Sequence, residues 1–495
     1  MTYCLFHLGG TMRNNVRFYL SDQLIELSRL DSNLTLLDFL RNERQRCGTK
    51  EGCAEGDCGA CTVVIADFIK GELKFKAVNS CIVFVASLDG KQVLTVEDLK
   101  SPDGELHPVQ QAMVDLHGSQ CGFCTPGFIM SLFALYHTEP NPDLESITDS
   151  LIGNLCRCTG YRPILDAARA AVENRPKHYW DGAMNEIVKR LETFKDDQDV
   201  EIVQNTGNYF IPKEIDSLLR LKSKHPASYL LAGGTDLGLF VTKRKMHLDT
   251  IIQVTEVAEL KKIDVEQSDI TLGAAVTYSD AMPVLRKYFP SFCSLVLRLG
   301  SRQIRNLGTI GGNLVNASPI GDSPPALIAL DSRVVISSVR GERELPLFEF
   351  FKDYRKTALE PDEILKEVII PRIDDALHFK TYKLSKRFDQ DISSVCGAYK
   401  LQLSNQKIED IRICYGGMAA TPKRAYHTED YLRSKVWDRE TINSAMEKLD
   451  NDFNPMNDFR GSVDYRKLAC QNLLMRFYLE TTGQIGPGGV LDYGN

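Results

Sequence analysis

The sequence has no long uninterrupted apolar run, although the chain is 495 residues long. A transmembrane helix needs about 20 consecutive apolar residues, so we expect no membrane span. The first ten residues, MTYCLFHLGG, lack a basic segment followed by a long apolar core, so they do not predict an export signal. We therefore expect a cytoplasmic protein, and Met12 is an alternative start of the chain.

An excess of positive charge is also absent. The 59 lysines and arginines are outnumbered by 66 aspartates and glutamates, which gives a formal net charge of −7. This balance argues against nucleic acid, a polyanion, as the main partner. Hydrophobic residues (43%) and charged residues (25%) occur in proportions typical of a globular chain. At roughly 100–200 residues per domain, the length predicts three or four domains.

Cysteine, in contrast, is abundant. Nine of the 14 cysteines lie between positions 47 and 158. In a reducing compartment such density favours metal or redox sites over disulfides. Four other cysteines are scattered among apolar residues and are predicted to be small core side chains. They are Cys293, Cys396, Cys414 and Cys470.

Local patterns divide the chain into five segments. In order, they predict a small α+β domain, a four-helix domain, a polar linker with one helix, a larger α/β domain and a last α+β domain. Their expected bounds are residues 13–99, 100–175, 176–200, 201–376 and 377–485.

Three stretches carry specific local predictions. SNLTLLDFLRNER, residues 32–44, predicts a helix capped by Ser32 or Asn33. DITLGAAVTYSDAM, residues 269–282, predicts strand structure. LGSRQIRNLGTIGGNLVNASPIGDSPPALIAL, residues 299–330, predicts a long loop that leads into a helix.

The first dense group of cysteines has the spacing C-x4-C-x2-C-x19-C, formed by Cys53, Cys58, Cys61 and Cys81. This spacing is typical of plant-type [2Fe–2S] ferredoxins, in which four thiolates hold the cluster. Gly52, Gly56 and Gly59 give the loop room to wrap the cluster and to direct backbone N–H groups at its sulfurs. A structural zinc site is the alternative, although only Cys58 and Cys61 form the usual zinc knuckle. Cys47 is predicted to be a bystander.

The second group consists of Cys121 and Cys124, followed by Cys156 and Cys158. Each pair lies at the end of a predicted helix of the same domain. Folding would therefore bring four thiolates together, and a four-cysteine zinc site is again the alternative.

Taken together, the ferredoxin-type loop, QCGFCTPG and NLCRCTGYRPI resemble the iron–sulfur part of the molybdenum hydroxylases, the family of xanthine dehydrogenases and aldehyde oxidases. The resemblance implies a β-grasp ferredoxin domain and a four-helix domain, each with a [2Fe–2S] cluster. It implies that the four-helix cluster lies nearer a molybdenum–pterin cofactor and that the ferredoxin-type cluster lies nearer a flavin. Gln120 matches a glutamine that contacts the pterin in the family.

Two glycine-rich stretches follow in the larger α/β domain. LLAGGTDLGL, residues 230–239, is not a G-x-G-x-x-G motif and is compatible with an ordinary strand-to-helix turn. The second stretch, residues 308–325, has the sequence GTIGGNLVNASPIGDSPP and is rich in glycine, asparagine and serine. A stretch of this composition can expose backbone N–H groups to a pyrophosphate. Asp322 could accept hydrogen bonds from ribose or ribityl hydroxyls.

Both stretches resemble the flavin domain of the same family, which is related to the vanillyl-alcohol-oxidase and CO dehydrogenase flavoproteins. The resemblance implies bound FAD, with an aromatic of some relatives replaced here by Leu299, and with Lys383 near the isoalloxazine. A solvated strand lysine is the alternative interpretation of Lys383. The implied contacts with the diphosphate and adenosine are Leu230, Leu231, Ala232, Gly233, Gly234, Thr235, Asp236 and Leu237. The implied phosphate and sugar contacts are Thr309, Asn313 and Asp322, and Leu365 would pack near the cofactor.

Single-chain members of the family continue into a large molybdopterin-binding portion, and no stretch here offers a pterin site or the catalytic glutamate. The resemblance therefore implies an electron-transfer subunit whose partner is a molybdopterin-binding large subunit, in a dimer of heterodimers. The iron–sulfur and flavin parts are fused in one chain, with the iron–sulfur part first. This order favours the small subunit of the bacterial xanthine dehydrogenase type over the carbon monoxide dehydrogenase or nicotinate type. Electrons from hypoxanthine or xanthine would pass through both clusters to FAD and then to NAD+.

Two other functions stay open. One is a subunit of an aldehyde or N-heterocycle oxidoreductase that uses oxygen or a quinone. The other is a zinc-bearing scaffold with an inactive flavin fold.

Overall fold

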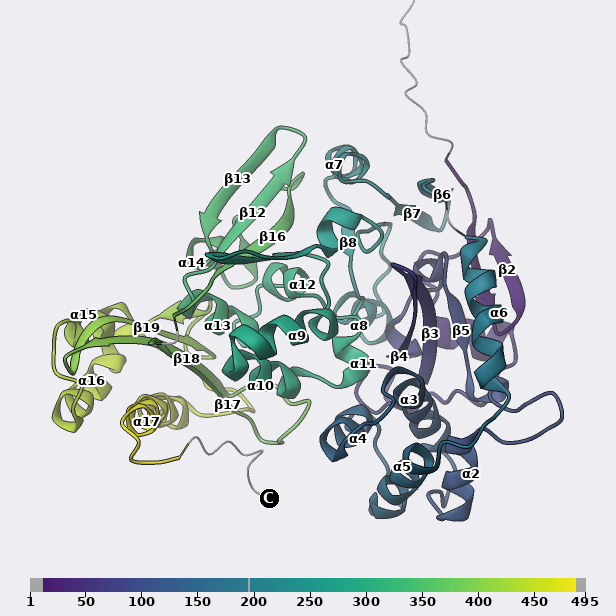
Figure 1. The fold of residues 1–495 in the computed structure, drawn as a ribbon. Coiled ribbons are helices and arrows are strands. Elements are labelled where there is room, and N and C mark those ends of the chain that lie inside the picture. Colours follow the sequence, from purple (N-terminus) through teal and green to yellow (C-terminus); the bar gives the residue numbers. More distant parts are fainter. Residues whose placement is uncertain (1–11, 195, 375, 487–495) are drawn as a thin grey trace, which may run out of the picture. The chain divides into compact units, whose positions relative to one another are not determined.

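The computed structural model describes residues 12–486 except 195 and 375. The alternative start, which concerns the residues before Met12, lies outside the described residues. The chain divides into two compact units, residues 1–259 with 300–308, and residues 260–299 with 309–495 (Figure 1). Each unit is described by itself.

The first unit begins with a five-stranded sheet in the order β2-β1-β5-β3-β4. β1 pairs with β5 in parallel, and the other pairs are antiparallel. Alternate residues of β1, Val16, Phe18 and Leu20, face the core, which is the period expected for a half-buried strand. The strands are β1 Val16–Leu20, β2 Gln23–Leu27, β3 Thr62–Ile69, β4 Glu72–Asn79 and β5 Gln92–Leu94.

The helix predicted after residue 32 begins later than expected. Thr35, not Ser32 or Asn33, is its N-cap, because the Thr35 hydroxyl accepts the Asp38 N–H at 3.1 Å. Asn33 instead exchanges two hydrogen bonds with the backbone of Leu248. The helix is short and its last part is a π-helix. These elements are α1 Leu36–Asp38 and η1 Phe39–Glu43, followed by η2 Ser80–Ile82, η3 Val85–Leu88 and η4 Val96–Asp98.

Four helices follow, as predicted, and α3 is buried along most of its length against β3 and β4 (Figure 1). The stretch predicted as a linker contains helix α6, which packs on the same core through Trp180, Ile187 and Leu191. The Trp180 indole N–H donates to the Leu99 carbonyl at 2.9 Å. The helices are α2 Pro108–Asp115, α3 Thr125–Thr138, α4 Leu144–Leu151, α5 Arg162–Asn174 and α6 Trp180–Glu192.

A second sheet of the first unit has the order β6-β7-β9-β8, with β9 parallel to both β7 and β8. Helices α7 and α8 follow β7 and β8, so this part is built from strand–helix–strand connections. Its elements are β6 Val200–Gln204, β7 Gly207–Ile211, α7 Ile215–Lys224, β8 Tyr229–Leu231, α8 Leu237–Thr242 and β9 Thr250–Gln253. Helix α11 Arg302–Arg305 also belongs to this unit.

The second unit contains an antiparallel sheet in the order β10-β11-β16-β12-β13. Its buried face packs on helices α9, α10, α12 and α13. The elements are η5 Ala258–Lys261, β10 Ile263–Val265, β11 Asp269–Gly273, α9 Tyr278–Tyr288, α10 Pro290–Leu299, α12 Ile310–Val315, α13 Ser323–Ala329, β12 Arg333–Ser338, β13 Gly341–Pro346, α14 Leu347–Phe350, β14 Phe351–Asp353, β15 Lys356–Thr357 and β16 Ile364–Pro371.

Two local predictions in this region are wrong. The strand predicted over 269–282 ends at Gly273, because Thr277 accepts the Asp280 N–H and caps helix α9. The predicted loop within 299–330 contains two helices, α11 and α12, which start at the serine and threonine caps Ser301 and Thr309. The helix predicted at the end of this stretch is confirmed as α13.

The second unit ends in a four-stranded antiparallel sheet, β17-β18-β19-β20, against which α17 packs. All four scattered cysteines are buried in this unit, which confirms that they are core side chains. No helix within residues 12–486, as described, is long and apolar enough to cross a membrane. The last elements are β17 His378–Leu384, β18 Val395–Ser404, β19 Lys407–Gly416, β20 Lys423–Arg424, α15 Tyr426–Leu432, α16 Arg439–Asp452 and α17 Val463–Thr481.

Candidate redox centres

The structure brings the first four predicted cysteines together. The Cys53 N–H donates to Cys58 Sγ and the Cys58 N–H donates to Cys53 Sγ, each at 3.3 Å. Cys61 at the end of the same loop and Cys81 in η2 are 2% and 1% exposed, and their thiols hydrogen-bond each other. Three loop cysteines and one from a distant turn thus converge, which fits the donor set of a [2Fe–2S] cluster.

Backbone N–H groups point at these sulfurs. Besides Cys58, the backbone of Glu55 and of Asp57 donates to the Cys53 sulfur, and the backbone of Gly56 donates to the Cys81 sulfur. Gly56 has a φ of +78°, a conformation that favours glycine. The loop therefore offers the N–H donors that would stabilise a negatively charged cluster.

In each hydrogen-bonded thiol pair, Cys53–Cys58 and Cys61–Cys81, one thiol has a lowered pKa and the other a raised pKa. The hydrogen bond from the Cys58 thiol, together with the backbone donors, lowers the pKa of Cys53 to about 5. The same bond raises the pKa of Cys58. Likewise, the shared hydrogen bond lowers the pKa of Cys61 and raises that of Cys81. Binding a metal cluster requires all four thiolates, so it would release the shared protons.

The second predicted group also converges, but nearer the surface. Cys124 caps helix α3 and pairs with Cys156, while Cys121 pairs with Cys158. Cys156 is 7% exposed, whereas Cys121 and Cys158 are exposed. Burial raises the pKa of Cys124 to about 12. Four thiols from the two loops flanking α3 and α5 can therefore hold a second cluster, as the spacing predicts.

The loop that bears Cys156 is held by two local contacts. The Cys156 N–H donates to the Tyr161 hydroxyl at 3.0 Å, and the Cys156 sulfur lies 3.1 Å from Thr159 Oγ1. Phe123 and Leu155 are exposed beside the cysteines, and so is Gln120, the predicted pterin contact. One edge of this site thus presents apolar and polar side chains to the surface.

A direct hydrogen bond joins the two cysteine groups. The N–H of Leu155, next to Cys156, donates to the carbonyl of Cys58 at 3.0 Å. The backbones of Gly59 and Gly153 are in direct contact beside this bond, because a Cβ on Gly59 would lie 2.1 Å from the Gly153 carbonyl oxygen. The two sites are therefore neighbours through the main chain.

The predicted diphosphate loop lies beside the first cysteine group, within the same unit. Leu230 and Leu231 end β8, Ala232, Gly233, Gly234, Thr235 and Asp236 form the turn, and Leu237 begins α8. A Cβ on Gly234 would lie 2.8 Å from the carbonyl oxygen of Ile82, and one on Gly238 would lie 2.9 Å from the Ile82 Cβ. Because Ile82 follows Cys81, the turn packs directly on a residue adjacent to a cluster ligand.

The other predicted flavin residues lie in the second unit. Thr309 accepts the Gly312 N–H at 3.0 Å, which opens helix α12. On that helix, Asn313 Oδ1 is buried and makes no hydrogen bond within the described part of the chain. An acceptor without a donor fits a cofactor that carries hydroxyl groups, as FAD does.

Lys383 is not the solvated lysine of the alternative interpretation. It is 5% exposed, and its Nζ donates to Asp322 at 2.6 Å and to the Arg298 carbonyl at 3.1 Å. The other Asp322 oxygen accepts the Ser393 hydroxyl at 2.5 Å. Leu365 is buried in the core and Leu299 is partly buried beside it. The buried Lys383–Asp322 pair therefore puts a fixed cation and anion in the region predicted to hold the flavin and its sugar.

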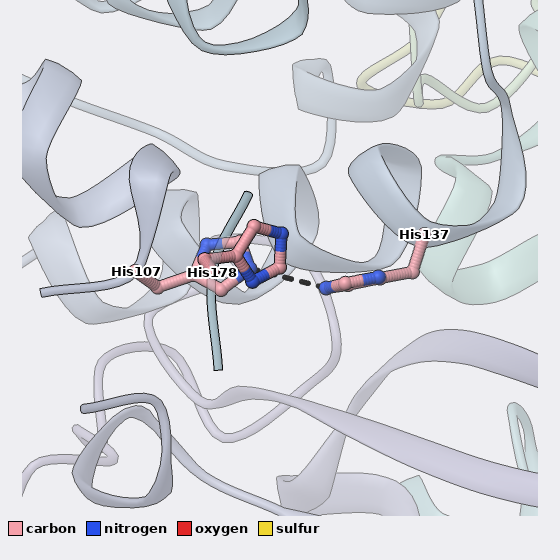
Figure 2. A group of neighbouring side chains, drawn as sticks. All are labelled: His107, His137 and His178. Carbon is pink, nitrogen blue, oxygen red and sulfur yellow. Dashed lines mark hydrogen bonds between the residues drawn. The ribbon is translucent and has the colours of Figure 1, made fainter. Parts of the chain in front are cut away.

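Three histidines that the sequence interpretation missed also come together. Ring nitrogens of His107, His137 and His178 all lie within 4.8 Å of one another (Figure 2). The Nδ1 atoms of His107 and His178 accept the N–H groups of Val109 and Trp180, each at 3.2 Å. These bonds assign the proton of each ring to Nε2. Metal ligation at Nε2 of His107 or His178 would place an Nδ1–H against a backbone N–H, so the backbone bonds of these two rings disfavour ligation. Within the described residues, His107 and His137 are the pair of this group that hydrogen-bond each other.

The histidine cluster is held neutral by its surroundings. Nε2 of His107 lies 3.1 Å from Nε2 of His137, and aromatic rings of Phe133 and Trp180 pack against the pair. Burial lowers the pKa of His107 to about 2 and that of His137 to about 3, and it also lowers the pKa of His178. The spacing of these histidines, 30 and 41 positions apart, has no recognisable pattern in the sequence.

Four family models match consecutive parts of the chain. A 2Fe-2S iron-sulfur cluster binding domain matches residues 22–86, and a [2Fe-2S] binding domain matches residues 95–169. An FAD binding domain in molybdopterin dehydrogenase matches residues 202–373, and a CO dehydrogenase flavoprotein C-terminal domain matches residues 380–481.

Similar curated proteins are xanthine dehydrogenases. The enzyme of Emericella nidulans is 32% identical over 97% of this chain and 40% of its own length. Xanthine dehydrogenase 1 of Arabidopsis thaliana is 31% identical over 94% of this chain and 39% of its own length. The chain thus spans about two fifths of the length of the curated relatives it matches.

Solved structures align with about half of this chain. A carbon monoxide dehydrogenase chain from Hydrogenophaga pseudoflava aligns with a TM-score of 0.52 at 26% identity, over 54% of this chain and 94% of that chain. Quinoline 2-oxidoreductase from Pseudomonas putida 86 aligns with a TM-score of 0.52 at 26% identity, over 56% of this chain and 96% of that chain.

The chain therefore contains two iron–sulfur domains and an FAD-binding domain. The FAD model is described for molybdopterin dehydrogenase, and the chain is similar to xanthine dehydrogenases and to a carbon monoxide dehydrogenase chain. The predicted multidomain α+β fold, from the ferredoxin domain to the flavoprotein C-terminal domain, is confirmed.

Proposed function

We propose that the chain is the electron-transfer subunit of a xanthine dehydrogenase. Oxidation of hypoxanthine or xanthine to urate would occur at a molybdenum–pterin centre of a partner subunit, and electrons would leave through this chain to NAD+. The relatives named xanthine dehydrogenase support the substrate class. In this proposal the protein is cytoplasmic and forms a dimer of heterodimers.

The contact between the two cysteine groups carries the proposal. Cys121, Cys124, Cys156 and Cys158 would hold the entry cluster, because Cys121 and Cys158 are exposed and a partner could approach them. Cys53, Cys58, Cys61 and Cys81 would hold the inner cluster. The Leu155–Cys58 hydrogen bond supports passage from the first to the second, and the packing of Ile82 on Gly234 supports onward passage to the flavin loop.

The flavin-binding residues are part of the same proposal. Residues 230–237, Thr309, Asn313 and Asp322 would hold FAD through its diphosphate and sugars, and the Lys383 ammonium would favour an anionic flavin ring. Bound FAD would supply the chemistry that converts single-electron transfer into two-electron hydride transfer. Gln120, exposed beside Cys121, would contact the pterin of the partner subunit.

Analysis of the purified full-length protein tests the cofactor assignment. We expect iron, acid-labile sulfide and FAD in a ratio of about 4:4:1, as two [2Fe–2S] clusters and one flavin require. We also expect a molybdenum-containing partner to co-purify and to support reduction of NAD+ by xanthine. A colourless protein that contains zinc would refute the proposal and favour the scaffold interpretation.

The likeness to quinoline 2-oxidoreductase supports a second candidate, a subunit for oxidation of an N-heterocycle or aldehyde with oxygen or a quinone as acceptor. Stopped-flow reoxidation of the reduced protein discriminates between the two. Faster reoxidation by NAD+ than by oxygen supports the dehydrogenase, and the reverse order supports the second candidate.

A further inference from the structure

A short segment of the flavin-type region reaches into the junction between the two cysteine groups. Residues 300–308 lie between α10 and α12 in the sequence, yet they belong to the unit that contains both groups. Arg305, which is 1% exposed, binds both Asp149 oxygens at 2.5 and 2.7 Å, and Arg302 binds Asp149 and Glu139. The segment is therefore anchored on helix α4 and on the chain just after α3, close to the loop that carries Cys156.

Two fully buried amides meet at this junction. Gln303 is 0% exposed, and its Nε2 donates to Ser131 Oγ and to Asn154 Oδ1, each at 3.0 Å. Asn154 Oδ1 also accepts the Ser131 hydroxyl at 2.7 Å. Ser131 lies on α3, the helix that begins at Cys124. The Asn154 amide is thereby fixed from two directions on the side of the second cysteine group.

The same Asn154 amide reaches the first cysteine group. Its Nδ2 donates to the carbonyl of Gly59 at 3.1 Å and lies 3.3 Å from Thr62 Oγ1. Gly59 lies between the ligand candidates Cys58 and Cys61. Asn154 therefore bridges both groups, and it directly precedes Leu155, whose N–H donates to Cys58.

We propose that Asn154 and Gln303 are positioning residues for electron transfer between the two clusters, because they hold the Leu155 N–H on the Cys58 carbonyl. This inference rests on the proposed function, because it assumes that electrons pass between the two cysteine groups. Electronic coupling through a hydrogen bond depends steeply on its length. Within the described residues, no side chain lies between the packed backbones of Gly59 and Gly153. The side-chain amides of Asn154 and Gln303 therefore fix the position of the Cys156 loop relative to the Cys58 loop.

Gln303→Met is the sharpest variant. Gln303 Oε1 makes no hydrogen bond to the residues that the structure describes, so methionine of similar length removes the two Nε2 hydrogen bonds and leaves the other hydrogen bonds of the junction in place. Arg302→Gln is the matched control, because it weakens the anchor of the same segment on α4 without touching Asn154. Ser131→Ala, which keeps the direct Gln303–Asn154 bond, is a milder second variant in case Gln303→Met folds poorly.

Hydrogen exchange of the peptide that contains Leu155 is the first readout, and it does not depend on cluster chemistry. We expect faster exchange at Leu155 in Gln303→Met, a smaller increase in Ser131→Ala, and wild-type exchange in Arg302→Gln. Unchanged exchange in both Gln303→Met and Ser131→Ala would overturn the proposal that the amides hold this bond.

The second readout is made on the full-length protein and on its complex with the molybdenum partner. In Gln303→Met, we expect a changed magnetic splitting between the two reduced clusters in EPR spectra and a several-fold slower reduction of flavin by xanthine. Iron content should stay at the wild-type level. A normal splitting and rate, with only a lower melting temperature, would show that Gln303 is merely structural. If EPR spectra of the wild-type protein do not show two cluster signals, the result refutes the proposed function and not the role of Gln303.

Discussion

The two cysteine groups have the same four donors but different surroundings. Around Cys61 and Cys81 the protein is closed, and the sulfurs accept several backbone N–H groups. Around Cys121 and Cys158 the protein is open to the surface. A closed site with neighbours on both sides suits an inner relay, and an open site suits exchange with a partner. Burial, more than ligand type, therefore distinguishes the roles that we propose for the two sites.

The largest expected effect breaks the closed site. In Gly59→Val, the new Cβ would meet the Gly153 carbonyl at 2.1 Å, and the φ of +70° is unfavourable for valine. We expect the chain to lose most of its iron, measured by iron and sulfide analysis. Gly122→Val at the open site has a similarly unfavourable φ of +82° but open space at its Cβ, so it should retain more of its iron than Gly59→Val. Normal iron content in Gly59→Val would contradict the importance of the close packing.

A smaller effect should separate the two clusters in the wild-type protein. Because Cys121 and Cys158 are exposed, a chelator or a mild oxidant should remove the second cluster before the first. Samples taken during incubation with EDTA and then reduced should therefore lose one cluster signal in their EPR spectra while the other persists. Simultaneous loss of both signals would argue that the difference in burial does not protect the inner site.

The helical domain should also be the more acid-sensitive of the two iron–sulfur domains. His107 and His137 are neutral when folded, with pKa values of about 2 and about 3, and titrate near the ordinary histidine value of about 6.5 when unfolded. Their stabilising contribution is complete above that value and is lost as the pH falls below it, at up to roughly 1.4 kcal/mol per pH unit for each histidine. Residues 12–99 contain no histidine.

Urea unfolding between pH 7.5 and roughly pH 5 measures this effect. Fluorescence of Trp180, which packs near His137, reports on the helical domain in a variant with Trp437→Phe. In His137→Gln, the dependence of the unfolding free energy on pH should fall by about one proton. An unchanged dependence would show that His137 is not the neutral, titration-sensitive group described here.

The smallest expected effect concerns the potential of the second cluster alone. Thr159 Oγ1 lies 3.1 Å from the Cys156 sulfur, and its hydrogen bond helps to lower the pKa of that thiol despite its burial. Thr159→Val removes this donor, so the reduction potential of the second cluster should become slightly more negative. An EPR-monitored redox titration should show no shift in the first cluster. A shift in both would imply that the two sites are less independent than their surroundings indicate.

Short-range features were the most predictable from sequence. The four helices of the second iron–sulfur domain follow apolar periodicity and proline and glycine signals, and the C-x4-C-x2-C loop predicts thiols that converge because the chain between them is short. Errors arose where local signals compete. The sequence predicts a strand around Thr277 and a loop around Thr309, but each threonine caps a helix through its own hydroxyl.

The sequence by itself determined which donors are available: eight cysteines in two spaced sets, and a glycine-rich turn after a strand. Tertiary structure alone decided that the Leu155 N–H meets the Cys58 carbonyl, that Asn154 and Gln303 lock this junction, and that Lys383 is buried against Asp322. Residues 154 and 303 are too far apart in the chain for any local pattern to relate them. Their contact exists because buried amides must satisfy their hydrogen bonds, and only the folded chain shows which partners lie within reach.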